Sequence, residues 1–145
     1  MTGLEYVTGL MEGRLTVPMT SLLGYRIVVA EPGRVVFEGR PAAEHYNTMG
    51  AVHGGYAATL LDSCMGCAVH TMLGEGMGYT TMELKISFIR AMTEQTGVVR
   101  AEGTVLRAGR RAGFAEARLV DAAGALLAHA TSTCLVFPLK APASG

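Results

Sequence analysis

The rest of the chain is organised around the segment from His45 to Asp62, which reads HYNTMGAVHGGYAATLLD. It passes from a short polar loop into a long apolar segment. Between His53 and Gly74, Asp62 is the only residue with a formal charge. A helix that is apolar on nearly all sides is a buried helix. The stretch therefore predicts one long central helix that begins near His53.

Two features of this helix indicate chemistry. Asp62 faces a desolvation cost among apolar neighbours, so it must be paired, protonated or placed in a functional cavity. Eight residues earlier, Gly54 and Gly55 stand at the helix start, where free backbone N–H groups and the helix dipole favour negative charge. At about 1.5 Å per residue, roughly 12 Å separates Gly54 from Asp62. If both act on one carbonyl, Asp62 must come from a second chain.

Strands are predicted on both sides of the helix. Residues 1–20 read as an N-terminal helix and a connector broken by Pro18, and residues 138–145 as a flexible tail. Between 80 and 90 the alternation places one apolar set on a single face: Met82, Leu84, Ile86 and Phe88. β-rich runs bounded by turn signals predict strands over 25–30, 35–39, 80–90, 98–106, 113–120 and 126–137. The order favours one α+β domain over 1–145, an antiparallel sheet of about six strands wrapped around one long central helix.

The composition limits the partners. The 145 residues include 12 basic and 12 acidic side chains, so no net field favours nucleic acid or an anionic membrane. A hydrophobic content of 50% with 17% charged residues is high for a small monomer and predicts surface buried in an oligomer. Six strands and one long helix also leave sheet edges to be covered.

The sequence predicts a cytoplasmic location. Glu5 and Glu12 interrupt the N-terminal segment, which does not read as a signal peptide. Asp62 and Gly66 break the long apolar stretch, so no membrane span is expected. Three cysteines are an odd number and provide no disulfide framework.

The central motif resembles a known family. Asn47-x-x-Gly50-x-Val52-His53-Gly54-Gly55, followed by Asp62, is similar to the phenylacetate-degradation branch of the hotdog-fold acyl-CoA thioesterases. The similarity extends from about residue 22 to 137. It implies a hotdog fold, acyl-CoA bound at a dimer interface, and a homodimer or a dimer of dimers. It implies no cofactor and no metal.

The resemblance also implies roles for individual residues. Asn47 would orient water or the thioester, and Gly55 with Gly54 would supply the backbone donors for an oxyanion. Asp62 would be the general base or the nucleophile, between which the sequence does not choose. Thr81 matches a position where the family often has a polar hydroxyl residue.

Each of these residues also has a plainer interpretation. Asp62 can be a buried acid satisfied by local hydrogen bonds. Gly54 and Gly55 can permit close helix packing. Asn47 can form a turn or a cap, and is as readily structural as catalytic. His53 can cap the helix, and a positioning role is favoured over proton transfer.

An arginine cluster near one turn has two readings. Arg107, Arg110 and Arg111 gather there, and Arg90 is expected nearby. They form either a solvated hairpin or a clamp for the phosphates of CoA, which Arg binds through paired hydrogen bonds. Because aromatic residues make up 6% of the chain with no Trp, the acyl pocket is expected to be mostly aliphatic and Met-lined.

The remaining thiols and imidazoles carry weaker signals. Cys64 and Cys67 lie three residues apart inside the helix, and His70 completes a possible metal trio. Structural zinc prefers four ligands and reactive thiols favour a helix start, so core cysteines are expected. His45 and His129 have no evident partner.

The favoured function is hydrolysis of an acyl-CoA thioester, with a phenylacetyl or hydroxylated phenylacetyl group suggested by the resemblance. Backbone donors would stabilise the oxyanion, and the carboxylate would act as base or nucleophile. Two alternatives remain open. One is a non-catalytic acyl-CoA-binding module, and the other is an acyl-thioester hydratase on the same fold.

Overall fold

The structure is a computed structural model, and it describes residues 1–140. The first half of the chain forms helices α1 (Gly3–Met11) and α2 (Pro18–Leu23), strands β1 (Tyr25–Glu31) and β2 (Arg34–Gly39), the 3-10 turn η1 (Ala43–His45) and helix α3 (Gly54–His70). Strands β3 (Met77–Phe88), β4 (Val99–Ala108), β5 (Ala112–Asp121) and β6 (Leu126–Pro138) follow.

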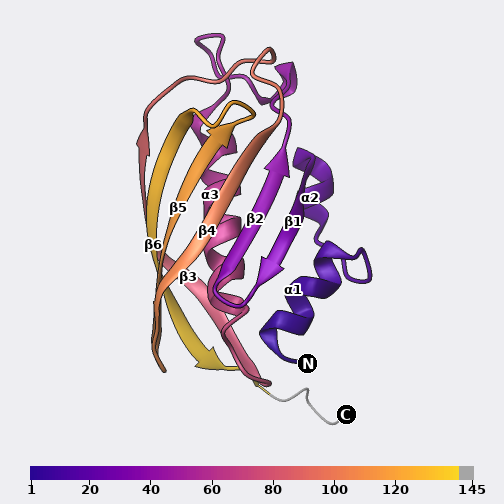
Figure 1. The fold of residues 1–145 in the computed structure, drawn as a ribbon, viewed down its shortest axis with the longest axis vertical. Coiled ribbons are helices and arrows are strands. Elements are labelled where there is room, and N and C mark those ends of the chain that lie inside the picture. The colour runs from indigo at the N-terminus through magenta and orange to yellow at the C-terminus, as the bar shows by residue number, and fades with distance from the viewer. Residues whose placement is uncertain (141–145) are drawn as a thin grey trace.

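All six strands form one antiparallel sheet in the order β1-β2-β4-β5-β6-β3. The sheet curves around α3, and α1 and α2 lie beside β1 at one side of the molecule (Figure 1). The predicted α+β architecture, with one long central helix, is confirmed. Strands β1 and β3 are the two edges, and β3 is the longer of them at 12 residues.

Helix α3 fills the concave side of the sheet. Leu60, Leu61, Met65 and Val69 on α3 are fully buried. The helix approaches β4 at Gly103, where a Cβ atom would collide with the backbone carbonyl of Cys64. A residue without a side chain is therefore required at that crossing.

Three local predictions differ from the structure. The predicted connector contains helix α2, because Pro18 occupies its first position, where proline favours a helix instead of breaking it. Strand β3 begins three residues earlier than predicted. It also carries a bulge between Thr81 and Glu83, so Met82 is the extra residue and is exposed. Of the predicted apolar face, Leu84 and Ile86 pack against the core.

The C-terminal end is more ordered than expected. Pro138 belongs to β6, and the Leu139 N–H donates a hydrogen bond to the Gly76 carbonyl over 2.7 Å. The rest of the predicted tail, 141–145, lies outside the described residues. Within 1–140, no helix is both long and apolar enough to cross a bilayer.

Candidate active site

Asp62 lies on α3 with a specific hydrogen-bond partner on β3. The Thr81 hydroxyl donates to Asp62 Oδ1 over 2.8 Å, and both residues are half-buried. Both line a cavity of about 990 Å³, which we call the acid cavity. A carboxylate in this position is oriented by one donor and open to a ligand on its other side. We call Asp62 and Thr81 the acid half-site.

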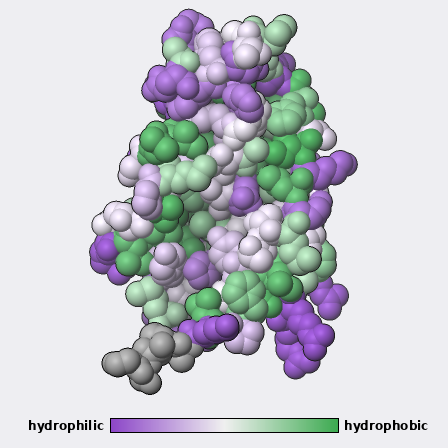
Figure 2. Space-filling model, turned by 180° about the vertical axis from the view of Figure 1, so that it is seen from behind, coloured by the Kyte–Doolittle hydropathy of each residue, from purple (hydrophilic) through white to green (hydrophobic). Residues whose placement is uncertain are grey.

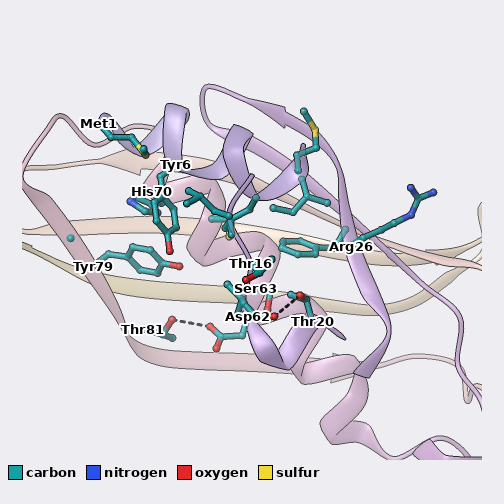
Figure 3. A pocket seen from close by; sticks show the side chains of 18 of the residues that line it. Met1, Tyr6, Thr16, Thr20, Arg26, Asp62, Ser63, His70, Tyr79 and Thr81 are labelled. Atoms are coloured by element: carbon teal, nitrogen blue, oxygen red, sulfur yellow. Dashed lines mark hydrogen bonds between the residues drawn. The ribbon is translucent and has the colours of Figure 1, made fainter. Parts of the chain in front are cut away.

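The acid cavity lies between α3, β3 and the N-terminal arm, which comprises residues 1–24. Figure 3 shows Tyr6 hanging from the arm beside His70, and Tyr79 pointing toward the middle of the cavity. From the face opposite to that of Figure 1, the surface is hollowed and hydrophobic side chains gather on both sides of the hollow (Figure 2). The N-terminal arm therefore forms the roof of the acid cavity.

The cavity wall is more aromatic than the composition suggested. Of the chain's five Tyr and four Phe side chains, three Tyr and one Phe line it: Tyr6, Tyr25, Tyr79 and Phe37. Methionines contribute as well, through Met1, Met11 and Met77. Aliphatic side chains and methionines still outnumber the aromatic ones, as expected of a mostly aliphatic and Met-lined pocket; the aliphatic residues are Leu10, Leu15, Val17, Ile27 and Leu139.

The thiols and the imidazole near this wall are held neutral by burial. Removal from water raises the pKa of Cys67 to about 12. Burial raises the pKa of Cys64 and lowers that of His70, whose ring packs 5.3 Å from the ring of Tyr79. All three cysteines are buried and unbridged. The expectation that they are core residues is confirmed.

His53 caps the N-terminus of α3. Its Nδ1 accepts a hydrogen bond from the Gly55 N–H over 2.7 Å. Within the described chain, the Gly54 N–H has no hydrogen-bond partner. A Cβ on Gly54 would lie 3.0 Å from the ring of Phe88, and one on Gly55 would lie 2.8 Å from His53 Nδ1. The Gly54 N–H can therefore donate to a ligand without any change. Rotation of the exposed His53 imidazole would also free the Gly55 N–H.

Asn47 holds the loop that precedes α3. Its Oδ1 accepts hydrogen bonds from the N–H groups of Met49, at 2.9 Å, and Ala51, at 3.2 Å. The turn-forming interpretation therefore applies to its carbonyl oxygen, while the side-chain NH2 group keeps its donors. We call Asn47, His53, Gly54 and Gly55 the donor half-site.

The two half-sites are apart in one chain. Gly54 and Asp62 lie eight residues apart on a continuous helix, which corresponds to roughly 12 Å. The acid cavity is lined by Asp62 and Thr81 but by no residue of the donor half-site.

Arg90 does not join the other three arginines. Arg110 and Arg111 are exposed at the β4–β5 turn and line a second groove of about 730 Å³, and Arg107 is exposed at the end of β4. The Val136 N–H bonds to the Arg111 carbonyl, whereas the Arg90 N–H bonds to the Leu127 carbonyl. Nine residues of β6 separate those contacts, about 30 Å at roughly 3.3 Å per residue. The prediction that Arg90 is nearby is wrong within one chain.

Two histidines have structural partners that the sequence did not reveal. His45 Nδ1 accepts from the Ala42 N–H at 2.9 Å, and its ring stacks on Tyr56 at 4.4 Å. His129 Nε2 lies 3.8 Å from a Glu116 carboxylate oxygen.

Sequence reasoning also missed residues of the acid cavity. Tyr79 and Tyr25 reach it from strands, and Ser63 follows Asp62 on α3. Of these residues, Ser63 could have been found from the sequence, because it is a second polar residue next to Asp62 in a mostly apolar helix.

Comparison with known proteins identifies the class. The family profile described as the thioesterase superfamily matches residues 49–128. The chain belongs to this superfamily, and it is a thioester hydrolase with the hotdog fold.

Individual relatives agree with this assignment. A provisionally named esterase of Saccharolobus solfataricus is 34% identical over 122 residues, which is 83% of this chain and 84% of that protein. Human acyl-coenzyme A thioesterase 13 is 30% identical over 109 residues, 74% of this chain and 76% of the human protein. A provisionally named thioesterase from Ralstonia eutropha, related to phenylacetic acid degradation, has a similar structure. Its TM-score is 0.80 at 27% identity, covering 90% of this chain and 98% of that one.

Proposed function

We propose that this protein hydrolyses acyl-CoA thioesters at sites formed by two copies of the chain. The observation that carries the proposal is Asp62, oriented by Thr81 in the wall of a large, partly aromatic cavity. A binding module has no need for an acid held in this way. The relationship to human acyl-coenzyme A thioesterase 13 supports CoA as the thiol component.

The chemistry divides between the two half-sites. The N–H groups at the start of α3 donate hydrogen bonds to the thioester carbonyl oxygen and stabilise its negative charge as the tetrahedral intermediate forms. Asp62 either removes a proton from an attacking water or attacks the carbonyl carbon itself. The C–S bond then breaks, and the CoA thiolate takes up a proton and leaves as the thiol. On the first route the attacking water is already part of the acid that leaves. On the second route a water hydrolyses the anhydride between the acyl group and Asp62, which releases the acid and restores the carboxylate.

Two copies are needed because, within one chain, roughly 12 Å separates the donor half-site from the acid half-site. Strand β3 offers the means of pairing, since it is a 12-residue edge whose outer side meets no other strand among residues 1–140. Within one chain, Thr81 contacts Asp62 near one end of β3, and Phe88 covers Gly54 near the other. An antiparallel β3–β3 pair centred on Lys85, in which the bulge residue Met82 takes no place in the ladder, sets Thr81 opposite Phe88 of the second copy. That register brings Asp62 of one copy toward Gly54 of the other.

The β4–β5 turn is the proposed contact for the CoA phosphates. Arg110 and Arg111 project beside a groove whose floor includes Met72, Leu73 and Pro138. Both guanidinium groups are exposed and make no ion pair with an acid in the described chain. They are therefore available for phosphate oxygens, which suit the planar geometry of Arg. If the protein forms a dimer of dimers, phosphate binding requires that the β4–β5 turn stays open to solvent in that assembly.

The acyl group is proposed to be phenylacetyl or a hydroxylated phenylacetyl. The aromatic wall of the acid cavity supports a ring as occupant, since aromatic pairs stabilise each other beyond the area they bury. The similarity to the Ralstonia eutropha protein related to phenylacetic acid degradation points the same way.

The test is release of CoA thiol from a panel of thioesters that includes phenylacetyl, hydroxyphenylacetyl and straight-chain members. Wild-type protein should release thiol, and Asp62→Asn should slow release by about 10² to 10⁴. Thr133→Val is a control on the far side of the sheet and should keep the wild-type rate. Tight binding of every thioester without release would favour a non-catalytic binding module. Addition of water to an unsaturated acyl group would favour a hydratase.

A further inference from the structure

Two hydroxyl groups meet in the wall of the acid cavity, one residue along α3 from Asp62. The Tyr25 and Ser63 hydroxyl oxygens lie 3.2 Å apart, and both residues line the cavity together with Asp62. Tyr25 is on β1 and Ser63 is on α3, so the pair joins the edge of the sheet to the central helix. The mechanism proposed above makes no use of either residue.

The pair has a hydrogen left over. Two hydroxyl groups carry two hydrogens, and the bond between them uses one. Within 1–140, neither hydroxyl donates to a further acceptor. Tyr25 is only 6% exposed and Ser63 is half-buried, and both line the cavity. The unused hydrogen can therefore be donated to an acceptor that a ligand brings into the cavity.

The donor is also fixed in direction and in protonation. The ring of Tyr25 packs against that of Phe37, with centroids 5.4 Å apart, and its hydroxyl is tied to Ser63. Burial raises the pKa of Tyr25, so the phenol keeps its proton at neutral pH. A donor held in place before the ligand arrives loses little conformational freedom on binding.

We propose that Tyr25 and Ser63 form a specificity subsite for an oxygen atom carried by the acyl group, either a hydroxyl or a carbonyl beyond the thioester. This inference rests on the proposed function and deepens it. Consecutive Cα atoms are about 3.8 Å apart. Asp62 and Ser63 are such neighbours on α3, and both line the acid cavity with Tyr25, so an acyl group that extends from Asp62 into the cavity shares it with the hydroxyl pair. The subsite selects oxygenated acyl groups over their unsubstituted counterparts.

The experiment compares matched acyl-CoA pairs that differ only by one hydroxyl or keto oxygen, placed at successive positions along a chain or ring. For wild-type protein, kcat/KM should favour the oxygenated member at one position or at two adjacent ones. Tyr25→Phe and Ser63→Ala should each lower that ratio by about threefold to tenfold, the range for one neutral hydrogen bond. Tyr56→Phe is the matched control, because Tyr56 is also a buried tyrosine but lies outside the acid cavity. It should keep the wild-type ratio.

Binding of ketone analogues, in which a methylene replaces the thioester sulfur, separates this inference from the proposed hydrolysis. Calorimetry should give the same preference for the oxygenated analogue, and the same loss in Tyr25→Phe. If wild-type protein cleaves no thioester yet shows this binding preference, the proposed hydrolysis is wrong and the subsite stands. If thioesters are cleaved but the ratio is unchanged in both Tyr25→Phe and Ser63→Ala, the subsite is wrong.

Discussion

The Thr81 hydroxyl donates a hydrogen bond to Asp62 Oδ1 over 2.8 Å, connecting the edge strand β3 to the central helix. Hydrogen bonds to a charged group contribute about 1.5–3 kcal/mol. Thr81→Val should therefore lower kcat by roughly tenfold to a hundredfold, because the carboxylate loses the contact that orients it. Thr81→Ser should recover most of that rate, since it restores the hydroxyl.

Thr133→Val is the control for this kinetic measurement. Thr133 also donates to a carboxylate, that of Glu83 at 3.0 Å, but at an exposed position outside the acid cavity. Equal kcat values for Thr81→Val and Thr133→Val would contradict a role for Thr81 in positioning the acid.

Mixing two inactive variants tests whether the site is shared. Asp62→Asn keeps the donor half-site, and Gly55→Val keeps the acid while its side chain displaces the His53 cap. In a symmetric dimer with random re-pairing, half of the dimers are mixed and each regains one of two sites. Recovery should therefore approach about a quarter of the wild-type rate.

Both variants must first be shown to fold and to exchange subunits, for example by mass spectrometry of differently tagged chains. Verified mixed dimers that stay as inactive as their parents would show that Asp62 does not act on a carbonyl bound by the other copy.

The arginine pair at the β4–β5 turn predicts a dependence on the nucleotide part of CoA. Changing Arg110 and Arg111 together to Ala should raise KM for a CoA ester by about tenfold, because charge-assisted contacts to phosphate are lost. KM for the matching pantetheine ester, which lacks those nucleotide phosphates, should stay nearly the same. Arg118→Ala on the exposed middle of β5 is the control. Equal KM increases for the two esters would exclude a phosphate clamp.

A close backbone contact at Gly3 holds the N-terminal arm against the end of α3. The Gly3 N–H donates to the Leu73 carbonyl over 3.0 Å, and a Cβ at Gly3 would collide with the backbone carbonyl of His70. Gly3→Ala should lower the free energy of unfolding by about 1–3 kcal/mol, the usual cost of overpacking. Gly74→Ala, where a Cβ would meet no atom within 4 Å, should change it by less than about 0.5 kcal/mol. Denaturant titration measures both, and similar values would contradict the proposed steric contact.

His70 predicts a pH dependence of stability. Burial lowers its pKa below the ordinary value of 6.5, so the unfolded chain binds a proton there more readily than the folded chain. The stabilisation of the folded state by neutral His70 is fully present above pH 6.5, and it is lost as the pH falls through the lowered pKa. The free energy of unfolding should thus fall more between pH 7.5 and pH 5.5 for wild type than for His70→Gln. Parallel curves would show that His70 does not titrate differently in the two states.

Local sequence patterns account for the central helix and for most of the sheet. The apolar run after His53 predicts α3, because a helix without a polar face must be buried. Alternation and turn residues predict the strands, since a strand with one face on the core repeats every second residue. Asp62 can be singled out as a charged residue where the pattern requires apolar ones, and the donors at Gly54 because the first N–H groups of a helix have no partner within it.

Other features required the folded chain. The bulge at Met82 depends on how β3 pairs with β6, and nothing in the alternation of residues 80 to 90 announces it. The sequence predicts a connector where helix α2 forms, because the same proline that ends one helix can begin another. The four arginines looked like one group, yet the sheet puts Arg90 about 30 Å from Arg111.

The buried helix, the acid inside it and the start of its N–H donors can all be read from the sequence, because burial and helix ends depend on neighbours a few residues apart. Folding brings Thr81, 19 residues away, to Asp62, and it lines one cavity with Asp62 and with tyrosines from α1, β1 and β3. Those contacts join residues that are distant in the chain. They depend on how β3, the N-terminal arm and α3 pack together, which no local pattern specifies.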